Sequence, residues 1–339
     1  MQDNTIHILC STDDNFVQHC GVMLYSLFLH NEKNKIVVHV IEKGLSCSNK
    51  NRLHEIAADF GQIIVYHTIN NDFVNRCKLS SYTALPVTVY FRLFISSILT
   101  DVFVEKILYL DCDVLVMRDL APLFDIDMND YTIAAVRDIN NPMYEEQSFQ
   151  ISFSYRDRYF NSGVMLINMK KWRADNIESI LIKECMRDRK VFFPDQDPLN
   201  KVFRDKWLEL PPMWNRFSLV NYDKVFFKKK IDLLNYIYNP AIIHFASPTA
   251  RPWMDLKFVP FGKIYNEYVK HTPWKGYKRQ KVEKQYRYKS IIMVTWRNFL
   301  YRNPLLIRIF LTSIYDVMLF FYHIIKHRSL RYYSPYRVE

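Results

Sequence analysis

The sequence lacks several features that would place it in other protein classes. Its six cysteines include no Cys-x-x-Cys pair, and Cys10 and Cys112 lie inside apolar, strand-like runs. This scatter argues against a zinc cluster. The N-terminus carries no basic segment, and its first apolar run, Ile6 to Cys10, is shorter than the hydrophobic region of a signal peptide. We therefore expect reduced thiols and a cytoplasmic protein.

Most of the chain also lacks net charge. Residues 1–276 carry 33 basic and 32 acidic side chains, whereas residues 277–339 carry 13 Lys or Arg against three acids. The first part therefore has no bulk charge that would attract nucleic acid. The basic tail contains no recognised nucleic-acid module, so we do not expect nucleic acid as a partner.

The basic tail is rich in Tyr, Trp and Phe and contains an apolar run over residues 305–325. This run is long enough to cross a bilayer, but Arg308 and Asp316 interrupt it, and both are costly in hydrocarbon. A helix lying on an anionic membrane surface fits better, and packing on the protein itself is the alternative. The sequence thus predicts a catalytic domain over 1–276 and a C-terminal membrane-association tail over 277–339.

Short β-branched runs alternate with helical patterns before residue 276, which favours an α/β fold with a mixed, mostly parallel central sheet. Apolar spacing predicts helices over 17–29 and 52–60, another after Pro86, and a long one from about 170 to 187. The expected strands cover residues 6–10, 36–41, 63–67, 106–111, 132–136 and 164–168.

The most informative run is the apolar segment from Lys106 that ends in Asp111-Cys112-Asp113. Carboxyl ends of strands are the usual position of ligand sites in open α/β sheets. Alternate positions on a strand point the same way, so both carboxylates can reach one hard divalent ion. A lone Asp-x-Asp is more often a solvated loop, but the hydrophobic strand before it favours a metal site.

This run resembles the Asp-x-Asp signature of glycosyltransferases with the A-type (GT-A) fold. Further segments in the same order are similar to glycosyltransferase family 8, which includes bacterial lipopolysaccharide galactosyl- and glucosyltransferases. The resemblance covers about residues 5 to 276. It implies a UDP-sugar donor, with Mn²⁺ or Mg²⁺ bridging the donor phosphates and stabilising the departing nucleoside diphosphate.

The resemblance implies roles for residues in the first half of the chain. The loop from Ser11 to Asn15 is similar to the family's nucleotide-binding loop, where Asp13 and Asn15 contact the uridine; turn chemistry is the alternative. Arg92 corresponds to an arginine that faces the diphosphate and donor sugar, and a surface ion pair is the alternative. The expected donor-contacting set comprises Ser11, Asp13, Asn15, Arg92, Asp111, Cys112, Asp113 and Arg251.

Residues on the sugar side follow later in the sequence. Asp138 closes a strand-like run and matches a carboxylate near the donor hydroxyls, and Asn161 lies in Phe160-Asn-Ser-Gly163, which introduces a strand in the family. Asp195 would bind sugar hydroxyls, unless it serves only to cap the following helix. Gln196 would lie on the ring face opposite the phosphate. These four residues form the predicted catalytic set.

The family retains the anomeric configuration of the donor, and an amide such as that of Gln196 is a poor nucleophile. We therefore expect attack from the face that the diphosphate leaves. A phosphate oxygen would take the acceptor proton, and Gln196 would stabilise positive charge at the anomeric carbon.

The third expected metal ligand is His244, which follows an apolar run. A lone histidine there is more often a satisfied core residue, but the resemblance makes it a ligand beside Asp111 and Asp113. Two carboxylates and a neutral imidazole suit Mn²⁺. The loop after His244 departs from the family pattern, since Arg251 replaces a lysine and the family's glycine has no match.

The resemblance therefore implies a retaining hexosyltransferase that uses UDP-galactose or UDP-glucose. The expected acceptor is a glycan or a lipid-linked molecule at the inner face of the cell membrane. Two alternatives stay open, namely a metal-dependent nucleotidyltransferase and a non-catalytic, membrane-associated sugar-nucleotide-binding protein. The first would need a Gly-rich or basic phosphate loop early in the chain, where residues 11–15 offer acids instead.

Overall fold

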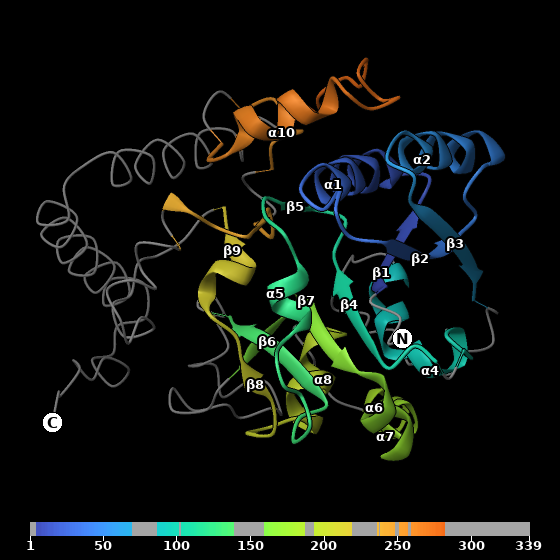
Figure 1. The fold of residues 1–339 in the computed structure, drawn as a ribbon, viewed down its shortest axis with the longest axis vertical. Coiled ribbons are helices and arrows are strands. Elements are labelled where there is room, and N and C mark those ends of the chain that lie inside the picture. The colour runs from blue at the N-terminus through green and yellow to red at the C-terminus, as the bar shows by residue number, and fades with distance from the viewer. Residues whose placement is uncertain are drawn as a thin grey trace, which may run out of the picture.

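A seven-stranded sheet forms the centre of the protein (Figure 1) in the order β3-β2-β1-β4-β7-β6-β8. The computed structural model describes residues 5–69, 87–101, 103–138, 159–186, 193–218, 236, 238–247, 251–256 and 259–281. Four of the six strand pairings are parallel, and those of β7 with β4 and β6 are antiparallel. The predicted mixed, mostly parallel sheet is confirmed. The strands are β1 (Ile6–Asp13), β2 (Ile36–Lys43), β3 (Ile63–Thr68), β4 (Lys106–Leu110), β6 (Ile133–Arg137), β7 (Phe160–Asn168) and β8 (Leu208–Glu209).

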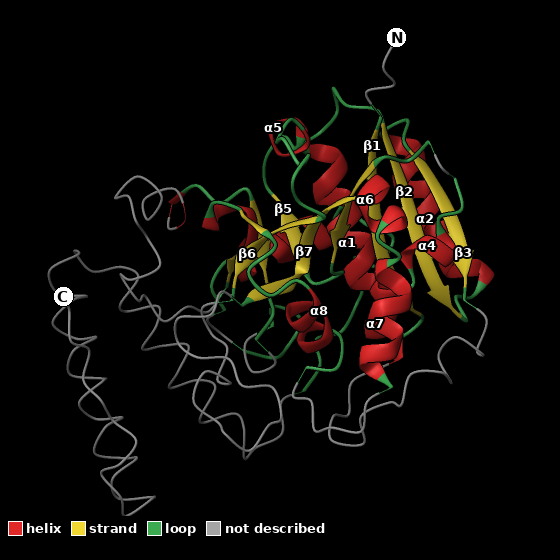
Figure 2. Ribbon diagram, turned by 90° about the horizontal axis from the view of Figure 1, so that it is seen from below, coloured by secondary structure: helices red, strands yellow, loops and turns green. Residues whose placement is uncertain are grey.

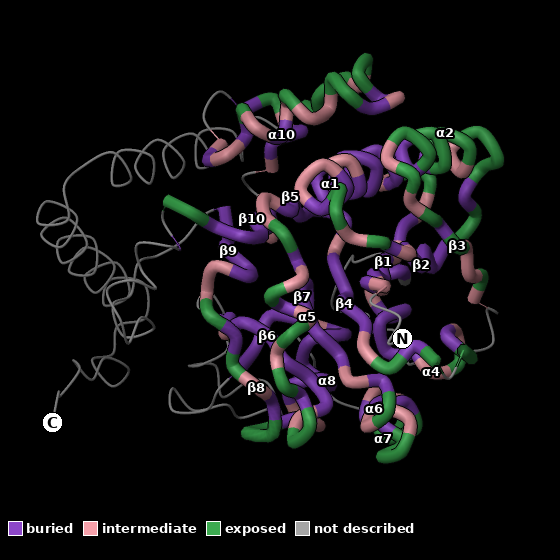
Figure 3. Tube along the Cα trace, in the orientation of Figure 1, coloured by how far each residue is buried: buried purple, intermediate pink, exposed green. Residues whose placement is uncertain are grey.

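Helices cover both faces of this sheet (Figure 2) because the central strands are apolar on both sides. Alternation along β1 sends Ile8 and Cys10 into a core beneath α1 and α2, and Leu9 into a second core on the other face. Figure 3 shows the resulting burial along β1, β4 and β7. The helices are α1 (Val17–Leu29), α2 (Cys47–Asp59), the 3-10 helix η1 (Val87–Leu93), α4 (Ile95–Ile98), α5 (Ala121–Phe124), α6 (Met169–Ala174), α7 (Ile177–Cys185) and α8 (Gln196–Val202).

A small second sheet begins shortly after β4 ends, with β5 as its first strand. Its order is β5-β10-β9, with β10 antiparallel to β5 and parallel to β9. It packs through Leu115, Ile243 and Phe245 against Tyr265 of α10. The elements are β5 (Val114–Val116), β9 (Arg216–Phe217), β10 (Ile242–His244), the 3-10 helix η3 (Pro212–Asn215) and α10 (Gly262–Val269).

Several predicted boundaries were wrong, each for a local reason. The helix expected after Pro86 is a 3-10 helix followed by the one-turn α4. The long helix expected over 170–187 is broken into α6 and α7, because Asn176 adopts the left-handed conformation with φ 50°. Strand β7 begins at Phe160 and not at 164, so the Asn-Ser-Gly stretch lies within the strand.

The start of the basic tail lies against the catalytic domain. Tyr277 packs on the core, and the backbone of Gln280 exchanges hydrogen bonds with Trp253 and Asp255. Residues 282–339, including the apolar run over 305–325, lie outside the described residues. Within the described part of the chain, no helix has the length and apolar character needed to span a bilayer. The domain boundary after residue 276 stays a prediction.

The His19 side chain of α1 is fully buried. The His19 ring stacks on Trp253 with ring centroids 3.9 Å apart, and Nδ1 lies 2.6 Å from the Tyr265 hydroxyl. Burial lowers the pKa of His19 to about 3, against a weaker opposing effect of Asp113. His19 is therefore neutral in the folded protein and takes up a proton mainly when the chain unfolds.

The free energy of unfolding should consequently fall as the pH drops below 6.5, the ordinary pKa of histidine. The unfolded state binds the additional proton there and the folded state does not, which costs up to about 1.4 kcal/mol per pH unit for one histidine. Melting temperatures between pH 7.5 and 5 test this. The variant His19→Gln should show a flatter pH dependence than the wild type, and equal slopes would contradict the assignment.

Candidate active site

The site forms where strands from three parts of the chain meet. Strand β4 ends at Leu110, and the antiparallel β7 begins opposite it, so the Asp111 amide donates to the Gly163 carbonyl over 2.8 Å. On the other side of Asp113, β5 pairs with β10 in a register that places His244 opposite Val114. The Phe245 amide donates to the Asp113 carbonyl over 2.9 Å. Backbone pairing thus fixes Asp111, Asp113 and His244 next to one another.

Two carboxylates and one imidazole converge at this point. His244 Nε2 lies 3.2 Å from Asp113 Oδ1 and 3.7 Å from Asp111 Oδ2. One ligand atom from each residue lies within 4.8 Å of the other two, so the group can hold a metal ion. Oxygen and imidazole donors together suit Mn²⁺ among the divalent metals. The donor set therefore fits the predicted ion.

Asp113 and His244 shift each other's pKa. Burial raises the pKa of Asp113, but the neighbouring His244 and Arg251 outweigh this effect and hold it below its usual value. Burial lowers the pKa of His244, yet Asp113 and Asp111 outweigh it and raise the pKa above its usual value. The two carboxylates thus favour positive charge beside them.

Asn215, at the end of η3, was not among the predicted site residues. Its Oδ1 lies 3.0 Å from His244 Nδ1, and its Nδ2 donates to Asn161 Oδ1 over 2.9 Å. An amide oxygen opposite Nδ1 favours a proton on Nδ1, so Nε2 is the nitrogen that would bind a metal ion held by the two carboxylates. The segment from Pro212 to Asn215 carries no motif that would reveal this role.

Gly163 provides the space in which the metal-site residues meet. A methyl group built at this position would lie 2.5 Å from Asp111 Oδ2 and even closer to His244 Cε1. One of these two side chains would have to shift to make room for the methyl group. The lack of a side chain at position 163 therefore allows Asp111 and His244 to meet as they do.

Arg92 is buried, with 4% of its surface exposed, so the surface ion pair considered from the sequence is wrong. Its guanidinium joins Asp111 Oδ1 at 2.7 Å to Asp195 Oδ2 at 3.1 Å, and it also donates to the Ser162 carbonyl at 2.9 Å. Burial opposes its charge, but Asp111 and Asp195 outweigh that effect and raise its pKa. Arg92 thus positions one predicted metal ligand and one predicted sugar ligand together.

The four predicted catalytic residues lie together beside Arg92. Gln196 Nε2 donates to Asp138 Oδ2 over 3.0 Å, and Gln196 Oε1 accepts from the Ser162 amide at 2.9 Å and from Asn161 Nδ2 at 3.1 Å. Asp195 precedes α8 but makes no side-chain cap hydrogen bond, and it accepts from the Ser162 hydroxyl instead. Its carboxylate therefore faces the site.

Three predicted donor-contacting residues lie at or just after the end of β1, namely Ser11, Asp13 and Asn15. The Cys112 side chain lies elsewhere. Asp13 follows turn chemistry, since its Oδ1 accepts from the amides of Asn15 and Phe16. Asn15 is exposed at the end of β1. The Ser11 hydroxyl lies 3.2 Å from the Tyr109 hydroxyl, which itself donates to Asp111. Cys112 is different, because its thiol points away from the two carboxylates and into the core, toward Cys10 and Cys20.

Asp111, Asp113 and His244 together are called the metal group below. Arg251 lies beside its Asp113. Its guanidinium approaches Asp113 Oδ2 at 3.8 Å and lies over the Trp253 ring. Its Nε is buried and has no hydrogen-bond partner within the described segments. An anionic oxygen bound at this edge would satisfy that donor.

The family profile described as Glycosyl transferase family 8 matches residues 7–257, which is most of the chain. The chain belongs to this family. It is therefore a glycosyltransferase, and the nucleotidyltransferase and non-catalytic alternatives are set aside. Family 8 enzymes of this kind use a nucleotide-sugar donor and a divalent metal ion, for which Asp111, Asp113 and His244 provide a fitting group.

Similar proteins share the sequence over most of its length. General stress protein A of Bacillus subtilis is 31% identical over 283 residues, which cover 80% of this chain and 96% of that protein. The lipopolysaccharide glucosyltransferase WaaO of Escherichia coli is 27% identical over 80% of this chain and 79% of its own. The crystal structure of galactosyltransferase LgtC with donor and acceptor sugar analogues is 25% identical, with a TM-score of 0.63 over 84% of this chain and all of that chain. The predicted GT-A fold is confirmed.

The glycine of β7 gives a first test of the site in this glycosyltransferase. Gly163→Ala should reduce metal-dependent donor hydrolysis at least tenfold, because the methyl group displaces Asp111 or His244. Gly276→Ala is the matched control, since a methyl group there meets no atom within 4 Å. Released nucleoside diphosphate is the measurement. Equal activity of the two variants would contradict the role of Gly163.

Asn215 gives a second test. Asn215→Leu removes the hydrogen bond that orients His244, so the Mn²⁺ concentration for half-maximal activity should rise about 10- to 100-fold. Asn266→Leu on α10 is the control and should leave this concentration unchanged. An unchanged Mn²⁺ requirement in Asn215→Leu would show that the His244 ring needs no such support.

Proposed function

We propose that this family 8 enzyme transfers galactose or glucose from a UDP-sugar to a glycan or lipid-linked acceptor, using Mn²⁺ or Mg²⁺ and retaining the anomeric configuration. The observation that carries the proposal is the convergence of Asp111, Asp113 and His244 within 4.8 Å. The sugar-side cluster of Asp138, Asn161, Asp195 and Gln196 lies next to it.

The residues around the metal group support a role in holding a diphosphate. When bound, the divalent ion would neutralise the negative charge that develops on the departing UDP. Arg92 restrains the Asp111 carboxylate, and Asn215 restrains the His244 ring. Arg251 offers a guanidinium at the same edge, with a buried Nε that has no hydrogen-bond partner among the residues the structure describes. Ser11, Asp13 and Asn15 lie at the end of β1, where we place the nucleoside.

The contacts of Gln196 support attack from the leaving-group face. Its Oε1 already accepts from the Ser162 amide and from Asn161, and an amide oxygen is a weak nucleophile. We therefore assign it to stabilising positive charge at the anomeric carbon. Asp138 and Asn161 hold its amide in place, and Asp195 and Asp138 offer acceptors for sugar hydroxyls. A phosphate oxygen of the donor would take the acceptor proton.

The acceptor assignment rests on similar proteins and on the tail. Several relatives are named as lipopolysaccharide glucosyl- or galactosyltransferases. Residues 277–339 carry the basic and aromatic side chains expected at an anionic membrane surface. We infer a lipopolysaccharide-type acceptor at the cytoplasmic face of the membrane, with the tail holding the enzyme there.

A panel of UDP-sugars with Mn²⁺ tests the reaction, with released UDP as the readout. UDP-galactose or UDP-glucose should be hydrolysed slowly without acceptor, and removal of the metal by a chelator should abolish release. Asp113→Asn should lose at least 100-fold in rate while keeping its circular dichroism spectrum, because it loses one anionic oxygen of the metal group. Wild-type activity of Asp113→Asn at saturating Mn²⁺ would overturn the metal assignment.

A truncation tests the tail. Because Gln280 is bonded to Trp253 and Asp255, the deletion should begin at residue 282 and not at 277. Deletion of residues 282–339 should preserve donor hydrolysis within about threefold and release the protein from anionic vesicles in co-sedimentation, since most of the basic residues of the tail are removed. Undiminished co-sedimentation would contradict membrane association through this segment.

A further inference from the structure

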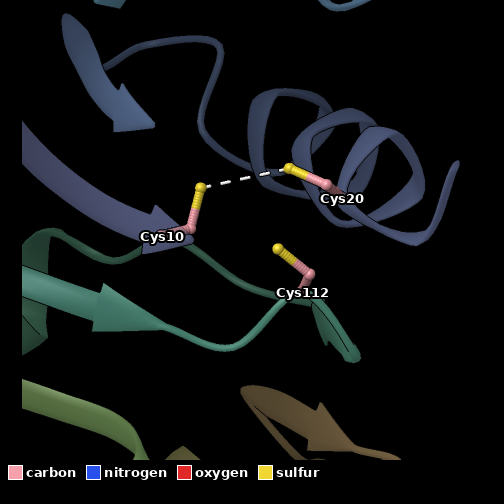
Figure 4. A group of neighbouring side chains, drawn as sticks. All are labelled: Cys10, Cys20 and Cys112. Atoms are coloured by element: carbon pink, nitrogen blue, oxygen red, sulfur yellow. Dashed lines mark hydrogen bonds between the residues drawn. The ribbon is translucent and has the colours of Figure 1, made fainter. Parts of the chain in front are cut away.

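Three cysteines that are distant in the sequence meet in the core beneath the metal group (Figure 4). Cys10 lies on β1, Cys20 on α1 and Cys112 between β4 and β5. Their sulfur atoms all lie within 4.8 Å of one another, and those of Cys10 and Cys20 are 4.0 Å apart. Cys10 and Cys20 are fully buried, Cys112 is 4% exposed, and all three are free thiols. We call this set the cysteine cluster.

The backbone explains why the thiols face one another. Alternation along β1 points Cys10 toward α1, and Cys20 lies on the helix face that covers β1. Cys112 lies in the turn between β4 and β5, and its thiol faces those of Cys10 and Cys20, whereas the carboxylates of Asp111 and Asp113 face His244. Three different elements thus direct sulfur to one place. Simple core packing would be satisfied equally by aliphatic side chains.

We propose that the cysteine cluster is a binding site for a soft, thiophilic metal ion of the Zn²⁺, Cd²⁺ or Cu⁺ class, separate from the site at Asp111, Asp113 and His244. Soft cations prefer thiolate sulfur, whereas the carboxylates of Asp111 and Asp113 favour harder ions. The two groups therefore differ in chemistry although Cys112 lies between the two acids in the sequence.

The sulfur positions fit such an ion. With a metal–sulfur distance of about 2.3 Å, three sulfurs arranged in a trigonal plane lie about 4.0 Å apart. The Cys10–Cys20 separation of 4.0 Å already matches this spacing, and all three sulfurs lie within 4.8 Å of one another. Small side-chain rotations would therefore close the site. Each thiol that coordinates as a thiolate releases one proton on binding.

Occupation of the cysteine cluster would also affect the catalytic metal group. The Cys112 thiol donates to the Ser11 carbonyl over 3.2 Å, which ties the segment between the two acids to the end of β1. Coordination would remove that proton and draw Cys112 toward Cys10 and Cys20. Since Asp111 and Asp113 are its direct neighbours, their carboxylates would shift, and Mn²⁺ would bind less tightly.

Titration of the full-length reduced protein with Cd²⁺ in excess Mn²⁺ tests the site. The readout is the ultraviolet sulfur-to-cadmium charge-transfer absorbance, which carboxylate and imidazole ligands do not produce. We expect one equivalent per chain after an incubation of hours, because the thiols are buried. The absorbance should be lost in Cys10→Ala and in Cys20→Ala, and kept in Cys47→Ala, since Cys47 is exposed on α2. Circular dichroism checks that each variant is folded.

Either of two results would overturn the proposal, namely no stoichiometric absorbance in the wild type or undiminished absorbance in folded Cys10→Ala and Cys20→Ala. The link to the catalytic group is read from Mn²⁺ affinity by electron paramagnetic resonance after dialysis, independently of enzyme activity. Cadmium should weaken Mn²⁺ binding at least threefold in the wild type and in Cys47→Ala, but not in Cys20→Ala. Equal weakening in all three proteins would overturn the link.

Discussion

Two carboxylates held close together in a mostly buried setting repel each other, and this repulsion constrains the architecture of the site. Asp111 and Asp113 both lie within 4.8 Å of His244, and 11% of the Asp113 side chain is exposed. Positive charge is therefore placed around them: Arg92 pairs with Asp111 at 2.7 Å, and Arg251 approaches Asp113 at 3.8 Å. Removing one partner of a fully buried pair typically costs about 3–5 kcal/mol, and the partial exposure of Asp111 and Arg251 makes the cost smaller here. A bound dication would supply the compensation that the side chains provide only in part.

The fold holds this charge arrangement through backbone pairing. The β4–β7 pairing places Gly163 beside Asp111, and the β5–β10 pairing places His244 beside Asp113. Both contacts depend on strand register, and a slip of one residue would turn the side chains to the other face. Behind them, Arg92 joins the metal group to Asp195 and Asn215 joins it to Asn161. The predicted metal ligands and the predicted sugar ligands are therefore linked by one network of side-chain contacts.

Much of this arrangement could be predicted from local sequence. The helix over 17–29 has the predicted bounds, and a buried strand does lead into Asp111. Asp111 and Asp113 lie in the turn between β4 and β5 and not on a strand, yet their carboxylates converge as the sequence predicted. The family resemblance pointed to His244 as their partner, and the structure places it beside them, whereas local patterns alone would have assigned it to the core.

Other features depend on tertiary contacts that no local pattern encodes. Asn215 lies in a segment without a motif, and only the packing of η3 beside β10 makes it the partner of His244. The cysteines were judged by their spacing, which reveals sites within one loop but not sulfurs contributed by β1, α1 and the β4–β5 connection. The helix break at Asn176 depends on the left-handed backbone conformation of that one residue. The spacing of apolar residues, from which the helix was predicted, does not reveal such a conformation.

The proposed reaction depends most on a single cation held between the middle and the end of the chain. An anomalous difference map from a crystal of the protein soaked with Mn²⁺ and UDP would locate this cation. One strong peak is expected within coordination distance of Asp111, Asp113 and His244 Nε2, in contact with the UDP phosphates. A manganese peak elsewhere, or UDP bound without manganese at these three residues, would contradict it.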